Sequence, residues 1–177
     1  MRNYLASFAV AAVTLLGSLP VWAATATASP QVLGWIEEGI VQPENISVKI
    51  KMDTGALTSS MDAKDLQRFD KNGDEWVRFN VEVKDSDTQK QVSAGFERKV
   101  ERDVKVRGAG GAEHRPVVLM NICIGKHIYN EEFSLKNRKN MNYPVLIGRK
   151  TLRKLGAIDV SKTFTREPTC TKSSGSK

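Results

Sequence analysis

Apolar and polar residues alternate with a period of two in several short stretches of this 177-residue chain. Residues 46–52 read Ile-Ser-Val-Lys-Ile-Lys-Met, and residues 76–83, 104–106, 117–124 and 133–135 show related patterns. This period matches a strand with one buried face. Turn-forming sequences separate the stretches at residues 71–74, 85–87, 108–111 and 125–126. Short strands at such frequent spacing predict an all-β barrel or sandwich with one core.

Two stretches indicate helix instead of strand. Residues 62–68 are predicted to form one or two helical turns after a loop. Within residues 148–155, Leu152 and Leu155 share one side of a helix and four cations occupy the other. We therefore expect one short amphipathic helix near the C-terminus.

The N-terminal residues differ in composition from the rest of the chain. Arg2 precedes an apolar run that is short for a membrane span, and Ala23 suits cleavage by signal peptidase. The sequence predicts a signal peptide (1–23), a flexible lead-in (24–33), a single domain (34–164) and a disordered tail (165–177). A periplasmic or secreted protein without an integral membrane span after cleavage follows, and an uncleaved N-terminal anchor is the alternative.

The formal net charge is +7, and loss of the predicted signal peptide with Arg2 lowers it to +6. A basic protein favours anionic partners such as acidic peptides or envelope polymers. We do not expect nucleic acid as a partner, because the cations are scattered along the sequence and no aromatic platform accompanies them.

Two cysteines, Cys123 and Cys170, occur in the chain. An exported protein can form a disulfide. Cys123 lies in an apolar run and Cys170 in the polar tail, which favours two unpaired thiols over one bond, and both arrangements stay open.

Asp53-Thr54-Gly55-Ala56 directly follows the alternating stretch 46–52. A carboxylate at a strand end can be held at a loop tip that solvent reaches. The threonine hydroxyl can bond main-chain groups and fix that loop, and glycine lets a main-chain N–H approach the carboxylate. The tetrapeptide alone is also compatible with an ordinary turn after a strand.

A second motif lies near the C-terminus, where Pro144-Val145-Leu146-Ile147 runs into Gly148-Arg149 and the expected helix. The two motifs in this order resemble the retropepsin family of aspartic proteases over about residues 34–160. There, Asp-Thr-Gly-Ala ends one strand, and an apolar triplet, Gly and Arg lead into the only helix. The resemblance implies a closed barrel with one short C-terminal helix, in which Ile147, Gly148 and Arg149 form a structural motif.

Within that family, the sequence is most similar to a bacterial group that carries the label ATP-dependent zinc protease. The pattern that it shares includes residues 51–60, residues 113–118 and the Gly148-Arg149 segment. The residues support neither part of that label. Only His114 and His127 occur as histidines, without the tight spacing that zinc ligands need, and no phosphate-binding glycine loop exists for ATP. We expect neither metal nor cofactor.

The resemblance implies peptide hydrolysis by a water molecule between two carboxylates that share a proton. Asp53, Thr54 and Gly55 would form the catalytic motif. The single motif predicts a homodimer in which two copies of Asp53 meet at a two-fold axis. Ala56 would contact a peptide or protein substrate.

Retropepsins also close a hairpin, the flap, over their substrate. The glycines of residues 108–111 suit its tip, and Gly110 and Gly111 are therefore expected to contact substrate; a plain hairpin turn is the alternative reading. The distance between the two motifs along the chain predicts an insertion relative to retroviral enzymes.

One position departs from the family pattern. Retroviral enzymes place an acid directly after Asp-Thr-Gly-Ala to pair with the later arginine, and this chain has Leu57 there. Arg149 then needs another partner, for which Asp159 or a carboxylate of the second copy are candidates. Two functions stay open: an aspartic endopeptidase of the bacterial envelope, and a barrel of the same kind that binds peptides or envelope polymer without cleaving them.

Overall fold

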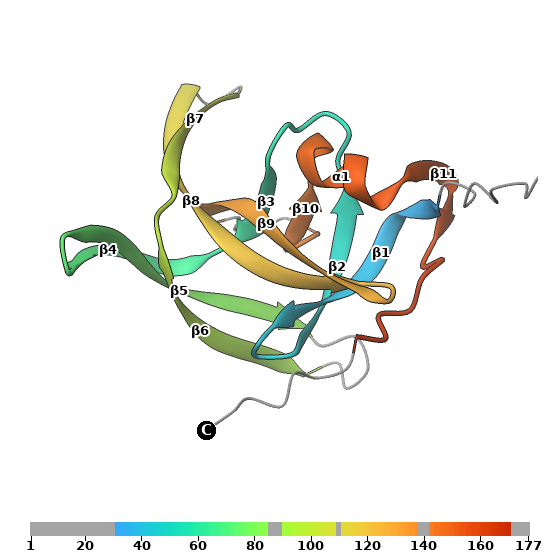
Figure 1. The fold of residues 1–177 in the computed structure, drawn as a ribbon, viewed down its shortest axis with the longest axis horizontal. Coiled ribbons are helices and arrows are strands. Elements are labelled where there is room, and N and C mark those ends of the chain that lie inside the picture. Colours follow the sequence, from blue (N-terminus) through green and yellow to red (C-terminus); the bar gives the residue numbers. More distant parts are fainter. Residues whose placement is uncertain (1–30, 85–89, 109–110, 138–141, 171–177) are drawn as a thin grey trace, which may run out of the picture.

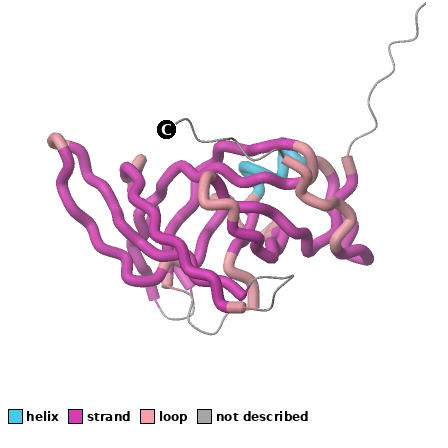
Figure 2. The backbone as a smooth tube through the Cα atoms, turned by 90° about the horizontal axis from the view of Figure 1, so that it is seen from below, coloured by secondary structure: helices cyan, strands magenta, loops and turns pink. Residues whose placement is uncertain are grey.

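The computed structural model describes residues 31–84, 90–108, 111–137 and 142–170 (Figure 1). Strands dominate this part of the chain, and α1 (Arg149–Leu155) is its one helix (Figure 2). The strands are β1 (Val32–Gln42), β2 (Ile46–Met52), β3 (Ser59–Asp62), β4 (Lys64–Lys71), β5 (Asp74–Lys84), β6 (Gln91–Lys99), β7 (Arg102–Gly108), β8 (Gly111–Ile124), β9 (His127–Lys136), β10 (Val145–Ile147) and β11 (Ala157–Thr163).

Six strands close into a barrel. The larger sheet has the order β11-β1-β2-β10-β3-β9-β8-β7, and β1 also pairs with β8. The β1–β8 pairing closes β1, β2, β10, β3, β9 and β8 into a ring. Strands β11 and β7 lie outside this ring. A closed ring has no exposed edge between its members. The expected all-β retropepsin-like barrel with one short C-terminal helix is therefore confirmed.

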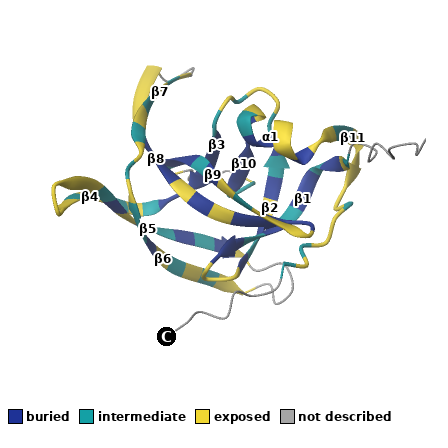
Figure 3. Cartoon of the chain, viewed as in Figure 1, coloured by how far each residue is buried: buried dark blue, intermediate teal, exposed yellow. Residues whose placement is uncertain are grey.

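Alternation within the strands builds the core (Figure 3). In β2 every second residue is buried, so that Val48 and Ile50 point inward while Lys49 is exposed. The same register places Phe133 and Leu135 of β9 in the cluster. The period-two stretches of the sequence therefore form the strands that they predict.

A separate three-stranded sheet, β4-β5-β6, is inserted between β3 and β7. Phe79 and Phe96 stack in its core with ring centroids 5.5 Å apart. The sheet includes residues 64–68, for which the expectation of helical turns is wrong. Antiparallel pairing with β5, as between Phe69 and Trp76, supplies main-chain partners that the local pattern of residues 62–68 does not reveal.

The N-terminal boundary also needs one correction. β1 begins at Val32, and Leu33 is fully buried, so the last two residues of the expected lead-in belong to the barrel. Residues 1–30 lie outside the described residues, and the signal peptide stays a prediction. Among the residues that the structure describes, no helix has the length and apolar character needed to cross a membrane.

The expected disordered tail is partly wrong as well, because residues 165–170 are fixed to the barrel. The carboxylate of the fully buried Glu37 accepts hydrogen bonds from the N–H groups of Gly34 (2.6 Å), Thr165 (3.1 Å) and Arg166 (3.0 Å). A disulfide joins Cys123 to Cys170, which corrects the preference for unpaired thiols. Residues 171–177 lie outside the described residues.

The disulfide closes a segment with a sequence separation of 47. Cys170→Ser should lower the free energy of unfolding by about 2–4 kcal/mol, because the unfolded chain regains conformational freedom. Urea unfolding of the oxidised protein measures the loss. Dithiothreitol should destabilise the wild type by a similar amount and leave the variant unchanged; an equal effect on both proteins would contradict the assignment.

Candidate active site

Asp53 follows the last residue of β2, and its position is fixed by main-chain contacts. Its N–H donates to the carbonyl of Ile147 (2.8 Å). The N–H of Gly55 donates to Asp53 Oδ1 (3.1 Å), as the sequence predicts. A side chain at position 55 would bring Cβ to 3.3 Å from that oxygen. The carboxylate is half-buried, so it is supported by the chain and still reachable from solvent.

The two sequence motifs meet because β2 and β10 pair in parallel. Met52 lies opposite Ile147 in this register. Parallel neighbours end at the same edge of a sheet, so the Asp53 loop and the start of α1 emerge side by side. The parallel pairing therefore places Asp53 beside Gly148, although the two motifs lie far apart in the sequence.

Three donors of Arg149 and Lys150 lock the loop after Asp53. The N–H groups of Arg149 and Lys150 donate to the carbonyls of Ala56 (2.9 Å) and Leu57 (3.1 Å). Arg149 Nη1 donates to the carbonyls of Thr54 (2.8 Å) and Gly55 (2.9 Å). The partners of the Arg149 side chain are thus main-chain oxygens, in place of the carboxylate that was expected.

The expected pairing of Arg149 with Asp159 is therefore wrong. Asp159 accepts hydrogen bonds from the N–H and hydroxyl of Ser161 and pairs with Lys162. Replacement of an acid by Leu57 leaves Arg149 with the loop carbonyls, which need no charged residue at position 57. A carboxylate of a second copy stays an untested partner.

Gly148 is the tightest point of contact between the two motifs. A Cβ there would lie 2.7 Å from the carbonyl carbon of Thr58 and 2.9 Å from the carbonyl oxygen of Leu57. Its N–H donates to Ser59 Oγ (3.1 Å). This hydroxyl fixes the loop from within the barrel, whereas the Thr54 side chain, which the sequence suggested for that task, is exposed.

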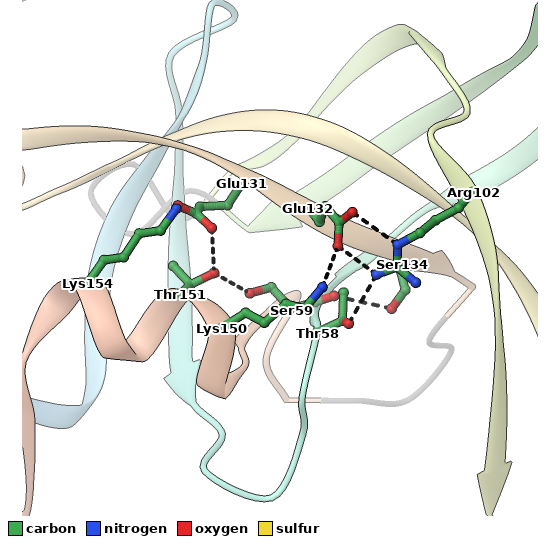
Figure 4. A network of polar contacts seen from close by, with 9 residues as sticks. All are labelled: Thr58, Ser59, Arg102, Glu131, Glu132, Ser134, Lys150, Thr151 and Lys154. Atoms are coloured by element: carbon green, nitrogen blue, oxygen red, sulfur yellow. Dashed lines mark hydrogen bonds and ion pairs between the residues drawn. The ribbon is translucent and has the colours of Figure 1, made fainter.

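A buried chain of hydrogen bonds continues from Ser59 (Figure 4). Ser59 Oγ lies 3.0 Å from Thr151 Oγ1, which donates to Glu131 Oε2 (3.3 Å). Lys154 donates to Glu131 Oε1 (2.5 Å). Because Thr151 gives its one hydroxyl proton to Glu131, it accepts from Ser59, whose own proton therefore goes to Thr151. This chain fastens α1 to β9 and to the loop of Asp53.

A cavity of about 530 Å³ opens next to Asp53. One wall is the Asp53 loop with Ala56 and Thr58, and the facing wall is β7 with Val104 and Val106. The β7–β8 hairpin thus has the place expected of the flap. The cavity carries five cationic side chains, Arg102, Lys105, Arg107, Arg115 and Lys150.

Residues 104–107 of β7, an edge strand of the larger sheet, line this cavity. β7 lies at one end of the larger sheet, with β8 as its neighbour. Asp103 lies opposite Pro116, which has no N–H, so this pair is of the non-hydrogen-bonded kind. Pairs alternate along an antiparallel ladder, and the main-chain groups of Lys105 and Arg107 therefore point away from β8. An extended peptide could pair with them as an added strand.

Carboxylates engage three of the cations. Arg102 donates to Glu132 through Nε (3.0 Å) and Nη2 (2.6 Å), and Lys150 lies 3.2 Å from the same carboxylate (Figure 4). The hydrogen bonds from Arg102, which have the largest effect, and from Lys150 lower the pKa of Glu132 to about 2. Burial of the carboxylate acts in the opposite direction and raises its pKa. Arg115 pairs with Glu113 at 2.9 Å.

The structure brings together most of the predicted site residues. Gly111 lies opposite Gly108 at the end of the hairpin, and Gly110 lies outside the described residues; contact of either with substrate stays a prediction. The sequence reasoning missed the five cations of the cavity, which it took for scattered surface charges. The alternation of Lys105 and Arg107 with Val104 and Val106 was the available signal.

No group of three or more His, Cys, Asp or Glu side chains suited to a metal ion occurs within the described ranges. His114 lies on β8 opposite Lys105, and His127 begins β9 beside Tyr129. The chemistry that the described site offers is that of a supported carboxylate in a cationic cavity.

Comparison with known proteins agrees with this reading of the fold. The model of the RimB-like family, described as retropepsin-like aspartic endopeptidase RimB, matches residues 32–169. The chain belongs to this family. The description names an aspartic endopeptidase, and the zinc protease label has no counterpart in it.

Relatives with known names or structures are similar to parts of the chain. A Legionella pneumophila protein of unknown function has a crystal structure with a TM-score of 0.66 and 31% identity, which covers 78% of this chain and 100% of that one. A "Probable alpha-L-glutamate ligase" of Shewanella halifaxensis is 30% identical over 119 residues, 67% of this chain and 26% of that protein. A protein of the same name from Desulfotalea psychrophila is 31% identical over 113 residues, 64% and 24%. The chain thus spans about a quarter of these curated relatives.

Gly148→Ala tests the contact between the two motifs. The added Cβ meets main-chain atoms of Thr58, so the variant should lose about 1–3 kcal/mol of unfolding free energy. Gly95→Ala is the matched control, because its Cβ would come no closer than 3.4 Å to the side chain of Asn80. Urea unfolding of both variants decides; equal stability of the two would contradict the tight contact.

Proposed function

We propose that this protein is an aspartic endopeptidase that hydrolyses peptide bonds with a water molecule activated by Asp53. The observation that carries the proposal is the cavity between the supported carboxylate of Asp53 and the open edge of β7. An extended peptide paired with this edge would pass over the carboxylate. General base catalysis by a carboxylate needs a water held within hydrogen-bond reach of it, and the cavity has room for both.

The second carboxylate would come from a second copy of the chain. Aspartic proteases need two carboxylates that share one proton, and the chain has one Asp-Thr-Gly. Beside the Asp53 loop lies a groove of about 550 Å³, in which Leu57, Leu152 and Ile158 supply apolar surface and Arg149, Lys150 and Arg153 also take part in the lining. Leu57 is 56% exposed. Burial of this surface against a second copy would stabilise a symmetric homodimer with both Asp53 loops at the axis.

Acidic peptides are the substrates that the charge of the site favours. Five cations line the cavity, against one carboxylate, that of Asp53. A cavity with one sign of charge attracts and orients ligands of the other sign. The curated relatives that match part of this chain are named glutamate ligases, which supports the same substrate class. The predicted signal peptide would place this activity in the periplasm or outside the cell.

A second candidate function is peptide or polymer binding without cleavage. The relatives named as ligases motivate it, because this chain matches only about a quarter of their length and a domain joined to a ligase could hold a peptide for its partner. The two functions differ in their need for the Asp53 carboxylate.

Asp53→Asn tests the hydrolysis directly. Cleavage of a mixed peptide library should fall by at least about 1000-fold, because the amide cannot act as a base. Asp70→Asn, near the end of β4 where the carboxylate accepts from the N–H of Gly73, is the matched control and should cleave as the wild type does. Mass spectrometry of the products measures both. Equal cleavage by wild type and Asp53→Asn would refute the proposal, and bound but uncut peptide would favour the binding function.

Mixing the two proteins tests whether two chains share one site. A tenfold excess of Asp53→Asn should place nearly every wild-type chain in a mixed dimer and reduce its activity to about one tenth. An equal excess of Asp70→Asn should not lower the activity per wild-type chain. Activity that stays constant in the presence of Asp53→Asn would show that each chain works alone.

A further inference from the structure

Two of the cations that line the Asp53 cavity share one carboxylate behind it. Arg102 projects from β7 and Lys150 from α1, and both border the cavity. Glu132 of β9 bonds both of them. It borders a separate hollow of about 280 Å³, to which Lys150 also contributes. Figure 4 shows Arg102, from β7, and Lys150, from α1, both reaching the carboxylate of Glu132.

We propose that Glu132 sets the specificity of the cavity by restraining Arg102 and Lys150, and so lowers the affinity of the cavity for carboxylate groups of the substrate. The inference rests on the proposed function and adds to it a residue that determines how strongly acidic peptides are preferred. Glu132 would not touch the reacting atoms; it acts through the two cations.

The geometry leaves the cations able to receive a second carboxylate. A guanidinium has five N–H donors. Arg102 donates to Glu132 through Nε and Nη2, and the side chains of Arg102 and Lys150 are 36% and 44% exposed. A substrate carboxylate in the cavity could therefore meet the same cations from the other side. This substrate carboxylate would lie near the negative charge of Glu132, and two negative charges that share the same cations repel each other.

Main-chain contacts hold the backbone of Arg102 and Lys150 in place without Glu132. Arg102 pairs with Val117 in the β7–β8 ladder, and the N–H of Lys150 donates to Leu57. Removal of the negative charge at position 132 should therefore leave the strand and the helix where they are. The pKa of Glu132, about 2, keeps the group ionised throughout a neutral assay.

The neighbouring residue supplies a matched control. Glu131 also lies on β9 and also pairs with a lysine of α1, Lys154, at 2.5 Å. Neither residue of this pair borders the Asp53 cavity. Glu131→Gln thus removes an ion pair between the same strand and helix without changing the charge of the cavity cations. Because Glu131 also accepts from Thr151, this control is compared through the ratio for the two peptides and not through total activity.

The test uses two fluorescent peptides that differ only in glutamate or glutamine at one position near the cleavage site. In Glu132→Gln the preference for the glutamate peptide, measured as the ratio of kcat/KM, should rise roughly three- to tenfold, because two cations are released from one anion. Glu131→Gln should leave the ratio unchanged. A ratio that stays constant or falls in Glu132→Gln would overturn the proposal and leave Glu132 a structural role.

A binding measurement separates this inference from the proposed hydrolysis. Fluorescence anisotropy with Asp53→Asn, alone and combined with Glu132→Gln, gives the dissociation constants of both peptides without cleavage. The double variant should bind the glutamate peptide more tightly by the same factor. Absence of cleavage by the wild type would remove the endopeptidase proposal only, whereas equal dissociation constants in the two backgrounds would remove the role of Glu132.

Discussion

The parallel pair of β2 and β10 carries the site, because it brings two segments far apart in the sequence to one edge of the barrel. The start of α1 then donates three N–H groups of Arg149 and Lys150 to the carbonyls of the Asp53 loop. Gly148 is required because a Cβ there would collide with that loop. The buried bonds of Ser59 and Thr151 fix the same contact from inside the barrel. Asp53 is consequently held by hydrogen bonds of its loop to the main chain of α1 and to the guanidinium of Arg149, and no acid at position 57 is needed.

Charge gives this supported carboxylate its surroundings. The flap strand β7 brings cations to the cavity on a strand whose free edge is suited to pairing with a peptide. Glu132 and Glu113 engage part of this charge, so the cavity is cationic but partly compensated. A hydrolytic carboxylate and a specificity for acidic ligands would then come from separate elements, the barrel and the hairpin.

Sequence reasoning predicted those parts of the fold that local pattern determines. The stretch 46–52 forms β2 with its predicted bounds, and the expected helix at 148–155 begins one residue later as α1. It failed where contacts between residues far apart in the sequence determine the structure. Residues 64–68 form a strand because β5 pairs with them, and residues 165–170 are ordered because Glu37 and Cys123 hold them. The cations were likewise visible one by one, but only the fold brings those of the hairpin together with Lys150 of α1.

The central claim is that two Asp53 carboxylates form one site. The number of inhibitor molecules bound per chain tests this claim most directly. A statine-containing acidic peptide, whose hydroxyl group imitates the tetrahedral intermediate, is titrated into the wild type in a calorimeter, with Asp53→Asn as the control. The account predicts one inhibitor bound per two chains and much weaker binding to the variant. One inhibitor per chain, or equal binding to both proteins, would contradict it.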